Sequence, residues 1–181
     1  GLFGQTVPGM EIGAHVHSEQ FNPYQFVKKI NSFTHSHITP LHAKAIMATK
    51  GFKNLNLTNQ IITCGAEPVT WDIIEAFVSK GCTFIVNWGM SEIGPIAINH
   101  IFNCMEEVER VKAICPANAT VMGSNKYCDY KIENGELVVK GDICIYDDWY
   151  YTQDKAIEID NILFYTGRTN KEVDFNNPSK G

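Results

Sequence analysis

The sequence predicts an α/β fold: a parallel β-sheet with flanking helices, followed by a small antiparallel β unit. Before residue 105, apolar segments of strand length alternate with helical segments, which is the pattern of a parallel sheet. After it, short alternating segments dominate, and Asn134-Gly135 between two of them is a strong signal for a two-residue hairpin. We expect an α/β subdomain over 1–105, a β-rich subdomain over 106–165, and a hinge region with a mobile tail over 166–181.

The first elements follow from local signals. The segment 13–17 alternates and predicts a short strand. A helix then begins at Pro23, a residue tolerated in a first turn, with Asn22 as its N-cap. Beyond it the pattern predicts a strand over 33–39, a helix over 41–49 that ends near Gly51, a strand within 57–63, a helix over 71–79 and a strand over 82–86. Thr70 is expected to cap the 71–79 helix, and Gly81 to end it.

The second part has a different character. The segment 105–110 is charged and predicts a connection between the two parts. The segments 127–133 and 136–146 alternate, as the two strands of the predicted hairpin should.

Composition narrows the function classes. The chain has 181 residues, 44% of them hydrophobic, which suits a globular core. With 15 basic against 20 acidic residues the net charge is −5, which argues against nucleic acid or an anionic membrane as a partner. Its apolar runs are far shorter than a membrane span, and no signal peptide is evident, so we expect a cytoplasmic protein.

Six cysteines are present, and none of them has Cys-x-x-Cys spacing, which disfavours zinc. A chain of this length and apolar content does not need disulfides, so we expect reduced and mostly buried thiols.

The most informative stretch is Asn87-Trp88-Gly89-Met90-Ser91-Glu92, which follows the strand predicted over 82–86. Strand ends deliver the chain to the edge where open α/β sheets bind ligands. An aromatic ring can stack on a base, a glycine permits close backbone approach, and a hydroxyl can donate to a phosphate. A carboxylate can hold magnesium, so these are the parts of a nucleotide site.

This stretch resembles the Tyr-Gly-x-Thr-Glu motif of adenylate-forming enzymes, the family of acyl-CoA synthetases, peptide-synthetase adenylation domains and luciferases. Further segments resemble family motifs in the family's order, and the likeness covers nearly the whole chain. They are Thr34-His35-Ser36-His37-Ile38-Thr39-Pro40, Thr63-Cys64-Gly65-Ala66-Glu67-Pro68, Gly135-Glu136-Leu137-Val138-Val139-Lys140-Gly141, Trp149-Tyr150-Tyr151-Thr152-Gln153-Asp154 and Tyr165-Thr166-Gly167-Arg168.

The resemblance implies roles for residues of the central motif. Glu92 would bind a magnesium ion that bridges ATP phosphates, and Ser91 would contact the α-phosphate, so these two are the candidate catalytic residues. Trp88, in place of the family tyrosine, would stack on adenine. The rest of the nucleotide contacts would come from Gly65, Ala66 and Glu67, which would also line the acyl pocket, and from Asn87, Gly89 and Met90.

Asp154 would accept hydrogen bonds from both ribose hydroxyls, and Arg168 would reach the same ribose. Without the resemblance, Asp154 would be a turn aspartate and Arg168 a surface arginine. Trp88 would be a packed core residue, and Glu92 a solvated loop glutamate. Gln153 departs from the family, which has glycine there, and so puts the backbone geometry before Asp154 in question. His35 and His37 could share a strand face, but no third metal ligand lies at a telling distance.

The implied activity is that of an acyl-adenylate-forming ligase. Such an enzyme activates a small carboxylic acid with ATP and magnesium to acyl-AMP, and coenzyme A is the expected acceptor. The family's phosphate loop and its catalytic lysine have no counterpart here, so we expect a partial chain that needs the remainder of the enzyme and is inactive alone. The alternative is a non-catalytic relative that keeps the fold for nucleotide binding or assembly. An unrelated α/β hydrolase is disfavoured because no Gly-x-Ser-x-Gly motif is present.

Overall fold

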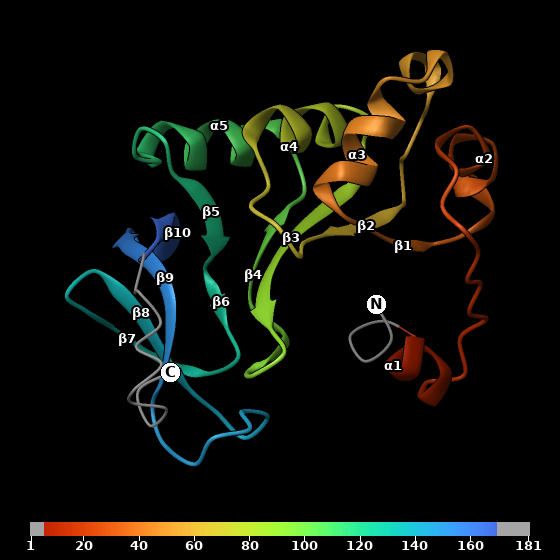
Figure 1. The fold of residues 1–181 in the computed structure, drawn as a ribbon. Helices are drawn as coiled ribbons and strands as arrows, with labels where there is room; N and C mark the ends of the chain where they lie inside the picture. Colours follow the sequence, from red (N-terminus) through yellow and green to blue (C-terminus); the bar gives the residue numbers. More distant parts are fainter. Residues whose placement is uncertain (1–5, 170–181) are drawn as a thin grey trace.

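A computed structural model describes residues 6–169 and shows two β-sheets side by side, with helices along one of them (Figure 1). Most of the expected hinge region and tail over 166–181, from residue 170 onward, lies outside the described residues. The helices are α1 Val7–Glu11, α2 Pro23–Lys29, α3 Pro40–Met47, α4 Trp71–Val78 and α5 Met105–Ile114, with 3-10 turns η2 Ile30–Ser32 and η3 Lys50–Asn54. The strands are β1 His35–Ile38, β2 Ile61–Cys64, β3 Thr83–Met90, β4 Gly94–Phe102, β5 Thr120–Gly123, β6 Asn125–Lys126, β7 Asp129–Glu133, β8 Glu136–Lys140, β9 Tyr150–Ile159 and β10 Ile162–Arg168.

The first sheet has the strand order β1-β2-β3-β4-β6. Strands β1, β2 and β3 run parallel, which confirms the predicted α/β arrangement. The sheet then continues with two antiparallel strands that the sequence did not reveal, because β4 returns directly from β3 and β6 pairs with β4. Helices α3, α4 and α5 lie along one face of this sheet (Figure 1).

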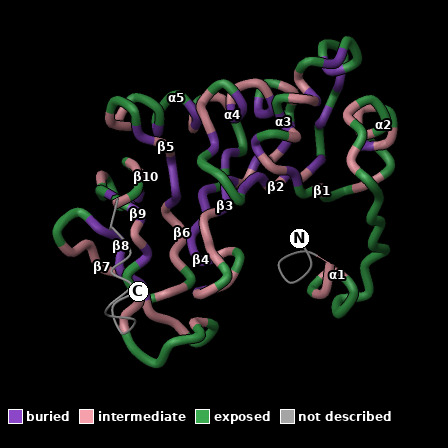
Figure 2. Tube along the Cα trace, in the orientation of Figure 1, coloured by how far each residue is buried: buried purple, intermediate pink, exposed green. Residues whose placement is uncertain are grey.

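The main core lies between those helices and the first sheet. Alternate strand residues such as Ile62, Phe84 and Phe102 point into it and meet Ile73 and Phe77 of α4. All five side chains are fully buried, and the buried trace in Figure 2 follows the same elements. The burial of these apolar side chains is the main source of stability where the helices pack on the sheet.

Three local predictions need correction. The segment 13–17 forms no strand, and the helix after β1 ends at Met47, so that Gly51 lies in the following 3-10 turn. Thr70 stands at the N-cap of α4, but its hydroxyl makes no capping bond and is buried without a partner among the described residues. The cap at Asn22 is confirmed, since its Oδ1 accepts from the N–H groups of Tyr24 and Gln25, each at 3.0 Å.

The charged segment after residue 105 is helical rather than connective. It forms α5, where two glutamates in the first turn favour the positive end of the helix dipole. Val108 and Val111 of α5 are buried in the main core. The boundary between subdomains at residue 105 stays a prediction.

The second sheet is antiparallel throughout, in the order β5-β10-β9-β8-β7, which confirms the predicted β unit. Glu133 pairs with Glu136 across the predicted two-residue turn. Asn134 and Gly135 have φ values of 52° and 80°, the left-handed pair that this turn type requires. The chain passes from the second sheet to the first between β5 and β6.

The six cysteines are free. Cys64 and Cys82 are buried, and burial raises the pKa of each thiol to about 12. The expectation of mostly buried thiols is wrong, because the other four are partly or fully exposed. Within residues 6–169, no helix is long and apolar enough to cross a membrane.

We expect the stability of the fold to depend on pH through the protonation of His100. Its ring is buried and lies between Glu107 of α5, 3.1 Å from Nε2, and the Ser124 hydroxyl, 3.2 Å from Nδ1. Burial lowers the pKa of His100, and Glu107 offsets this only in part. The unfolded chain therefore binds this proton more readily than the folded chain does. The free energy of unfolding should fall as pH drops through about 6.5, the pKa in the unfolded chain, and level off below the pKa in the folded chain.

Urea denaturation at pH 7.5 and 5.5 measures this change in the free energy of unfolding. The control is His100→Gln, and an equally large loss in that variant would contradict the assignment.

Candidate functional site

The central motif lies at the carboxyl end of β3. Trp88, Gly89 and Met90 are the last residues of the strand, and Ser91 and Glu92 form the turn to β4. Met90 pairs with Gly94, and the register shifts between Trp88 and Met90. The motif is therefore a hairpin end rather than a free loop beyond a strand.

Gly89 is required by the hairpin itself. A Cβ at this position would lie 2.5 Å from the carbonyl oxygen of Gly94 and 2.5 Å from the carbonyl carbon of Pro95. From the sequence we expected Gly89 to permit close approach of a ligand. The structure shows instead that the backbone of β4 approaches it.

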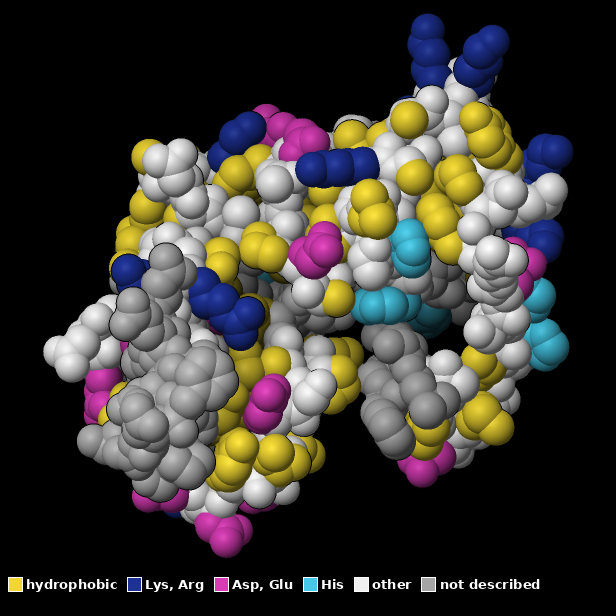
Figure 3. Space-filling model, in the orientation of Figure 1, with side chains coloured by type: hydrophobic (Ala, Val, Ile, Leu, Met, Phe, Trp, Pro, Cys, Tyr) yellow, Lys and Arg dark blue, Asp and Glu magenta, His cyan; other side chains and the backbone are white. Residues whose placement is uncertain are grey.

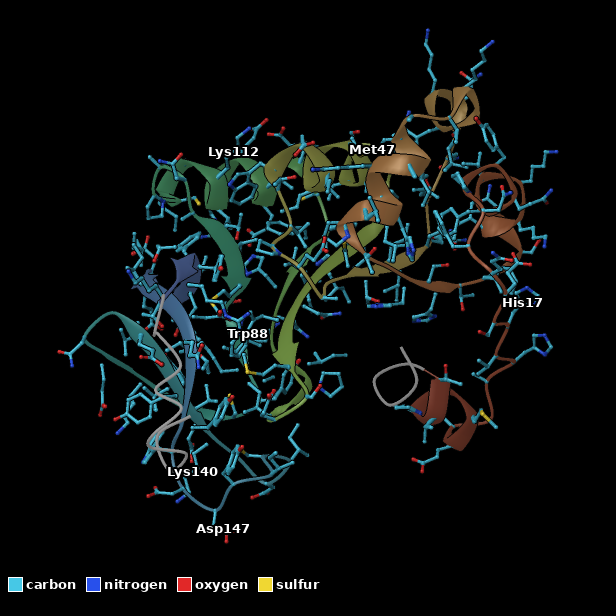
Figure 4. All side chains as sticks on the ribbon, viewed as in Figure 1. His17, Met47, Trp88, Lys112, Lys140 and Asp147 are labelled. Atoms are coloured by element: carbon cyan, nitrogen blue, oxygen red, sulfur yellow. The ribbon has the colours of Figure 1, made fainter. Side chains whose placement is uncertain are left out.

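The structure brings together three of the predicted nucleotide residues. The indole Nε1 of Trp88 donates a hydrogen bond to Asp154 Oδ2 at 2.9 Å. Arg168 Nε lies 3.4 Å from the other carboxylate oxygen, Oδ1, and the two residues are cross-strand partners on β9 and β10. Figure 4 shows Trp88 in the space between the two sheets. The Trp88–Asp154 bond joins residues 66 positions apart in the sequence.

Asp154 is 8% exposed, so its carboxylate is largely shielded from solvent. Burial raises the pKa of this carboxyl, while the Trp88 hydrogen bond and the Arg168 charge lower it in part. A carboxylate offers about four lone-pair positions, and these two residues take only one on each oxygen. Each oxygen can still accept another hydrogen bond, as two neighbouring ribose hydroxyls would need.

The turn at Ser91 and Glu92 closes the hairpin just beyond Trp88. Ser91 is exposed and Glu92 is half-buried. The Glu92 carbonyl accepts a hydrogen bond from the N–H of Ile145 at 2.9 Å, so the loop between β8 and β9 rests against the turn. The Glu92 carboxylate also helps to raise the pKa of Tyr150, after burial as the larger cause.

Gly65 and Asn87 form a second contact. A Cβ on Gly65 would lie 2.7 Å from the Asn87 carbonyl oxygen, so only glycine permits this approach of the two strand ends. Asn87 is 7% exposed, and its side-chain oxygen and nitrogen have no hydrogen-bond partner among the described residues. Ala66, which has a left-handed φ of 76°, and Glu67 follow at the exposed edge.

Asn87 and Trp88 point to opposite faces of the sheet, because both lie in regular register with β4 and strand neighbours alternate. One base cannot touch both side chains. The predicted residues therefore fall into two groups on either side of β3. Trp88, Asp154 and Arg168 form one, and Gly65 and Asn87 form the other.

Gln153, the departure from the family, adopts the backbone conformation that a glycine would favour. Its φ is 63°, in the left-handed region, which costs a residue with a side chain about 1–2 kcal/mol. The backbone before Asp154 is thus left-handed although the residue carries a side chain, and other contacts must hold it.

Those contacts come from residues to which the resemblance assigned no role. Glu136 Oε1 accepts from the Gln153 N–H at 2.9 Å, and the N–H of Thr169 donates to the Gln153 carbonyl at 2.7 Å. Glu136 is 6% exposed, and its contact with β9 is long-range, so no local sequence signal indicated it.

A magnesium site would rest on Glu92. In the described part of the chain, no three His, Cys, Asp or Glu side chains gather as a metal-binding group. One carboxylate is nevertheless compatible with magnesium, which is commonly held by one or two carboxylates together with substrate phosphates and water. Of the two histidines considered above as metal ligands, His37 instead contacts the Thr63 hydroxyl, which lies 2.9 Å from its Nδ1.

Comparison with solved structures places this geometry in a known fold. The anthranilate CoA ligase AuaEII in complex with anthranoyl-AMP superposes with a TM-score of 0.68 at 15% identity, over 86% of this chain and 34% of that one. The fold is that of the adenylate-forming enzymes. The N-terminal domain of FACL13 from Mycobacterium tuberculosis gives a TM-score of 0.66 at 15% identity, over 82% and 43% of the two chains. The luciferase-like enzyme of the mealworm Zophobas morio gives 0.63 at 16%, over 83% and 41%.

The predicted resemblance to adenylate-forming enzymes is therefore confirmed at the level of the fold. The chain spans between 34% and 43% of the length of these three structures. No family model and no curated protein sequence matches it. The roles of the individual residues stay predictions.

Proposed function

We propose that this chain supplies the base, ribose and magnesium contacts of an acyl-adenylate-forming ligase. The observation that supports this most is the hydrogen bond between Trp88 and Asp154. The resemblance assigns these residues to adenine and to ribose, moieties that are joined in one nucleotide. A shared site requires them to lie together, and their side chains are hydrogen-bonded to each other.

In this proposal the Trp88 ring stacks on adenine while its N–H, bound to Asp154, fixes the orientation of the ring. The remaining lone pairs of Asp154 accept both ribose hydroxyls, and Arg168 provides a donor beside them. Asn87 and Gly65 act from the other face, where they set the packing of the strand ends under the base. Ser91, in the exposed turn, donates to the α-phosphate.

Magnesium held by Glu92 would offset charge on the phosphates during attack by the carboxylic acid. The residues of this chain would then mainly hold the nucleotide in line for that attack, which is chiefly a positioning problem. The triphosphate loop, the catalytic lysine, the rest of the acid pocket and transfer to coenzyme A would come from the remainder of the enzyme. A cytoplasmic location is part of the same proposal.

The test is a titration of the 181-residue chain with AMP and with GMP, followed by NMR with assigned tryptophan side chains. We expect AMP to shift the Trp88 ring resonances in a saturable way, at millimolar concentrations, because half a site must overcome the full cost of association. Trp71 and Trp149 serve as internal controls. Equal shifts of all three tryptophans, or no saturation with AMP, would contradict a nucleotide site at Trp88.

Catalysis is tested separately by exchange of labelled pyrophosphate into ATP in the presence of carboxylic acids. For this chain alone we expect exchange at background, because no residue singled out here holds the β- and γ-phosphates. If AMP binds and exchange also stays at background when the missing parts are supplied in trans, the non-catalytic nucleotide-binding relative is the better description.

A further inference from the structure

Gln153 is held on both sides of its peptide unit. Its N–H donates to Glu136 Oε1 on β8 at 2.9 Å. Its carbonyl accepts from Thr169, which follows β10, through the backbone N–H at 2.7 Å and through the hydroxyl at 2.9 Å. Two neighbouring strands thus fix the one residue of β9 that has a left-handed φ.

Gln153 directly precedes Asp154 in β9. The pairing of β8 with β9 shifts register between Glu136 and Val138, which is the mark of a β-bulge. A bulge redirects the side chains next to it. The Asp154 N–H turns back to the Thr152 hydroxyl at 3.1 Å, and its carboxylate reaches Trp88 and Arg168.

Glu136 is a buried carboxylate whose charge is felt at Asp154. A buried carboxylate is costly unless it is hydrogen-bonded. Its negative charge also raises the pKa of Asp154, as a smaller cause than burial, and so opposes the ionised form that binds hydroxyls best. At the same time, Glu136 provides the acceptor for the Gln153 N–H.

We propose that Glu136 is a positioning residue for Asp154: it holds Gln153 in the left-handed conformation, from which the Asp154 carboxylate reaches the Trp88 indole and the ribose site. The ribose part rests on the proposed function. The hydrogen bond to Trp88 does not, and it gives an independent readout.

The experiment compares Glu136→Ala, Glu136→Gln, Gln153→Gly and the double variant Glu136→Ala/Gln153→Gly in the full chain. Two quantities are measured: the NMR shift of the Trp88 indole N–H proton and the dissociation constant for AMP. Glu136→Gln keeps an acceptor oxygen, whereas Glu136→Ala removes it. Gln153→Gly adopts a left-handed φ without strain, so it should restore the geometry even where Glu136 is absent.

We expect Glu136→Ala to move the Trp88 indole proton towards the position of a free indole and to weaken AMP binding about fivefold. Glu136→Gln should stay close to the wild type, and the double variant should return to it in both quantities. If Glu136→Ala lowers only the melting temperature, or if Gln153→Gly fails to rescue it, the positioning role is refuted. If the wild type does not bind AMP, the proposed function fails, and the indole proton alone still decides the role of Glu136.

Discussion

Replacing Gly123 with alanine is expected to lower the free energy of unfolding by about 3 kcal/mol or more, because it forces a side chain against backbone. A Cβ at this position would lie 2.0 Å from the carbonyl oxygen of Asn99 and 2.2 Å from its carbonyl carbon. These are atoms of β4, which cannot move away without breaking its pairing with β3 and β6. The φ of Gly123, 147°, adds strain for any side chain.

Gly135→Ala is the matched control. Gly135 also has a positive φ, of 80°, but a Cβ there would meet nothing within 4 Å. Only the backbone cost remains, which should be about 1 kcal/mol. Urea denaturation of both variants measures the difference in the free energy of unfolding. Equal stabilities would show that Gly123 does not pack this closely against the β4 backbone.

Asp154→Asn is expected to weaken AMP binding by at least about tenfold, because hydrogen bonds to a charged group contribute more than neutral ones. The amide has the shape of the carboxylate, but its NH₂ group would face either the Trp88 indole N–H or the Arg168 guanidinium, both of which are donors. The ribose would also lose one acceptor oxygen. The fold should tolerate the change, since burial disfavours the charge at this position.

Asp160→Asn is the control for this prediction. Asp160 lies in the exposed turn between the same two strands, β9 and β10, with a φ of 49° that asparagine tolerates well. An NMR titration with AMP compares the variants with the wild type. Unchanged affinity in Asp154→Asn, with the protein still folded, would remove Asp154 from the nucleotide site.

The sequence predicted those elements best whose local and long-range signals agree. The parallel strands β1–β3 and helices α3 and α4 have strand or helix periodicity and also bury one face, so the alternation could be read directly. The Asn134-Gly135 turn was predictable because few other residues accept two consecutive left-handed angles.

The failures have physical causes too. The segment that forms α5 is rich in glutamate, and its two buried valines are too few to show an apolar stripe. Strand β4 was missed because glycine and hydroxyl residues before it read as a loop, while Gly89 in fact permits close pairing of two strands. The role of Glu136 depends on contact with β9, which is 17 residues away and which no local pattern encodes.

An exposed loop remains outside the account of the site. Ile143, Ile145 and Tyr146, between β8 and β9, are exposed, and hydrophobic side chains gather at this end of the molecule in Figure 3. The loop touches the Glu92 turn through the hydrogen bond from the Ile145 N–H to the Glu92 carbonyl.

The central claim is that Trp88 and Asp154 bind one nucleotide. The most direct measurement is a set of intermolecular nuclear Overhauser effects in the 181-residue chain at saturating AMP. The account predicts contacts from the adenine protons to the Trp88 ring and from the ribose protons to the residues around Asp154, with none to Trp71 or Trp149. Contacts confined to another part of the surface, or none at concentrations where AMP is bound, would contradict it.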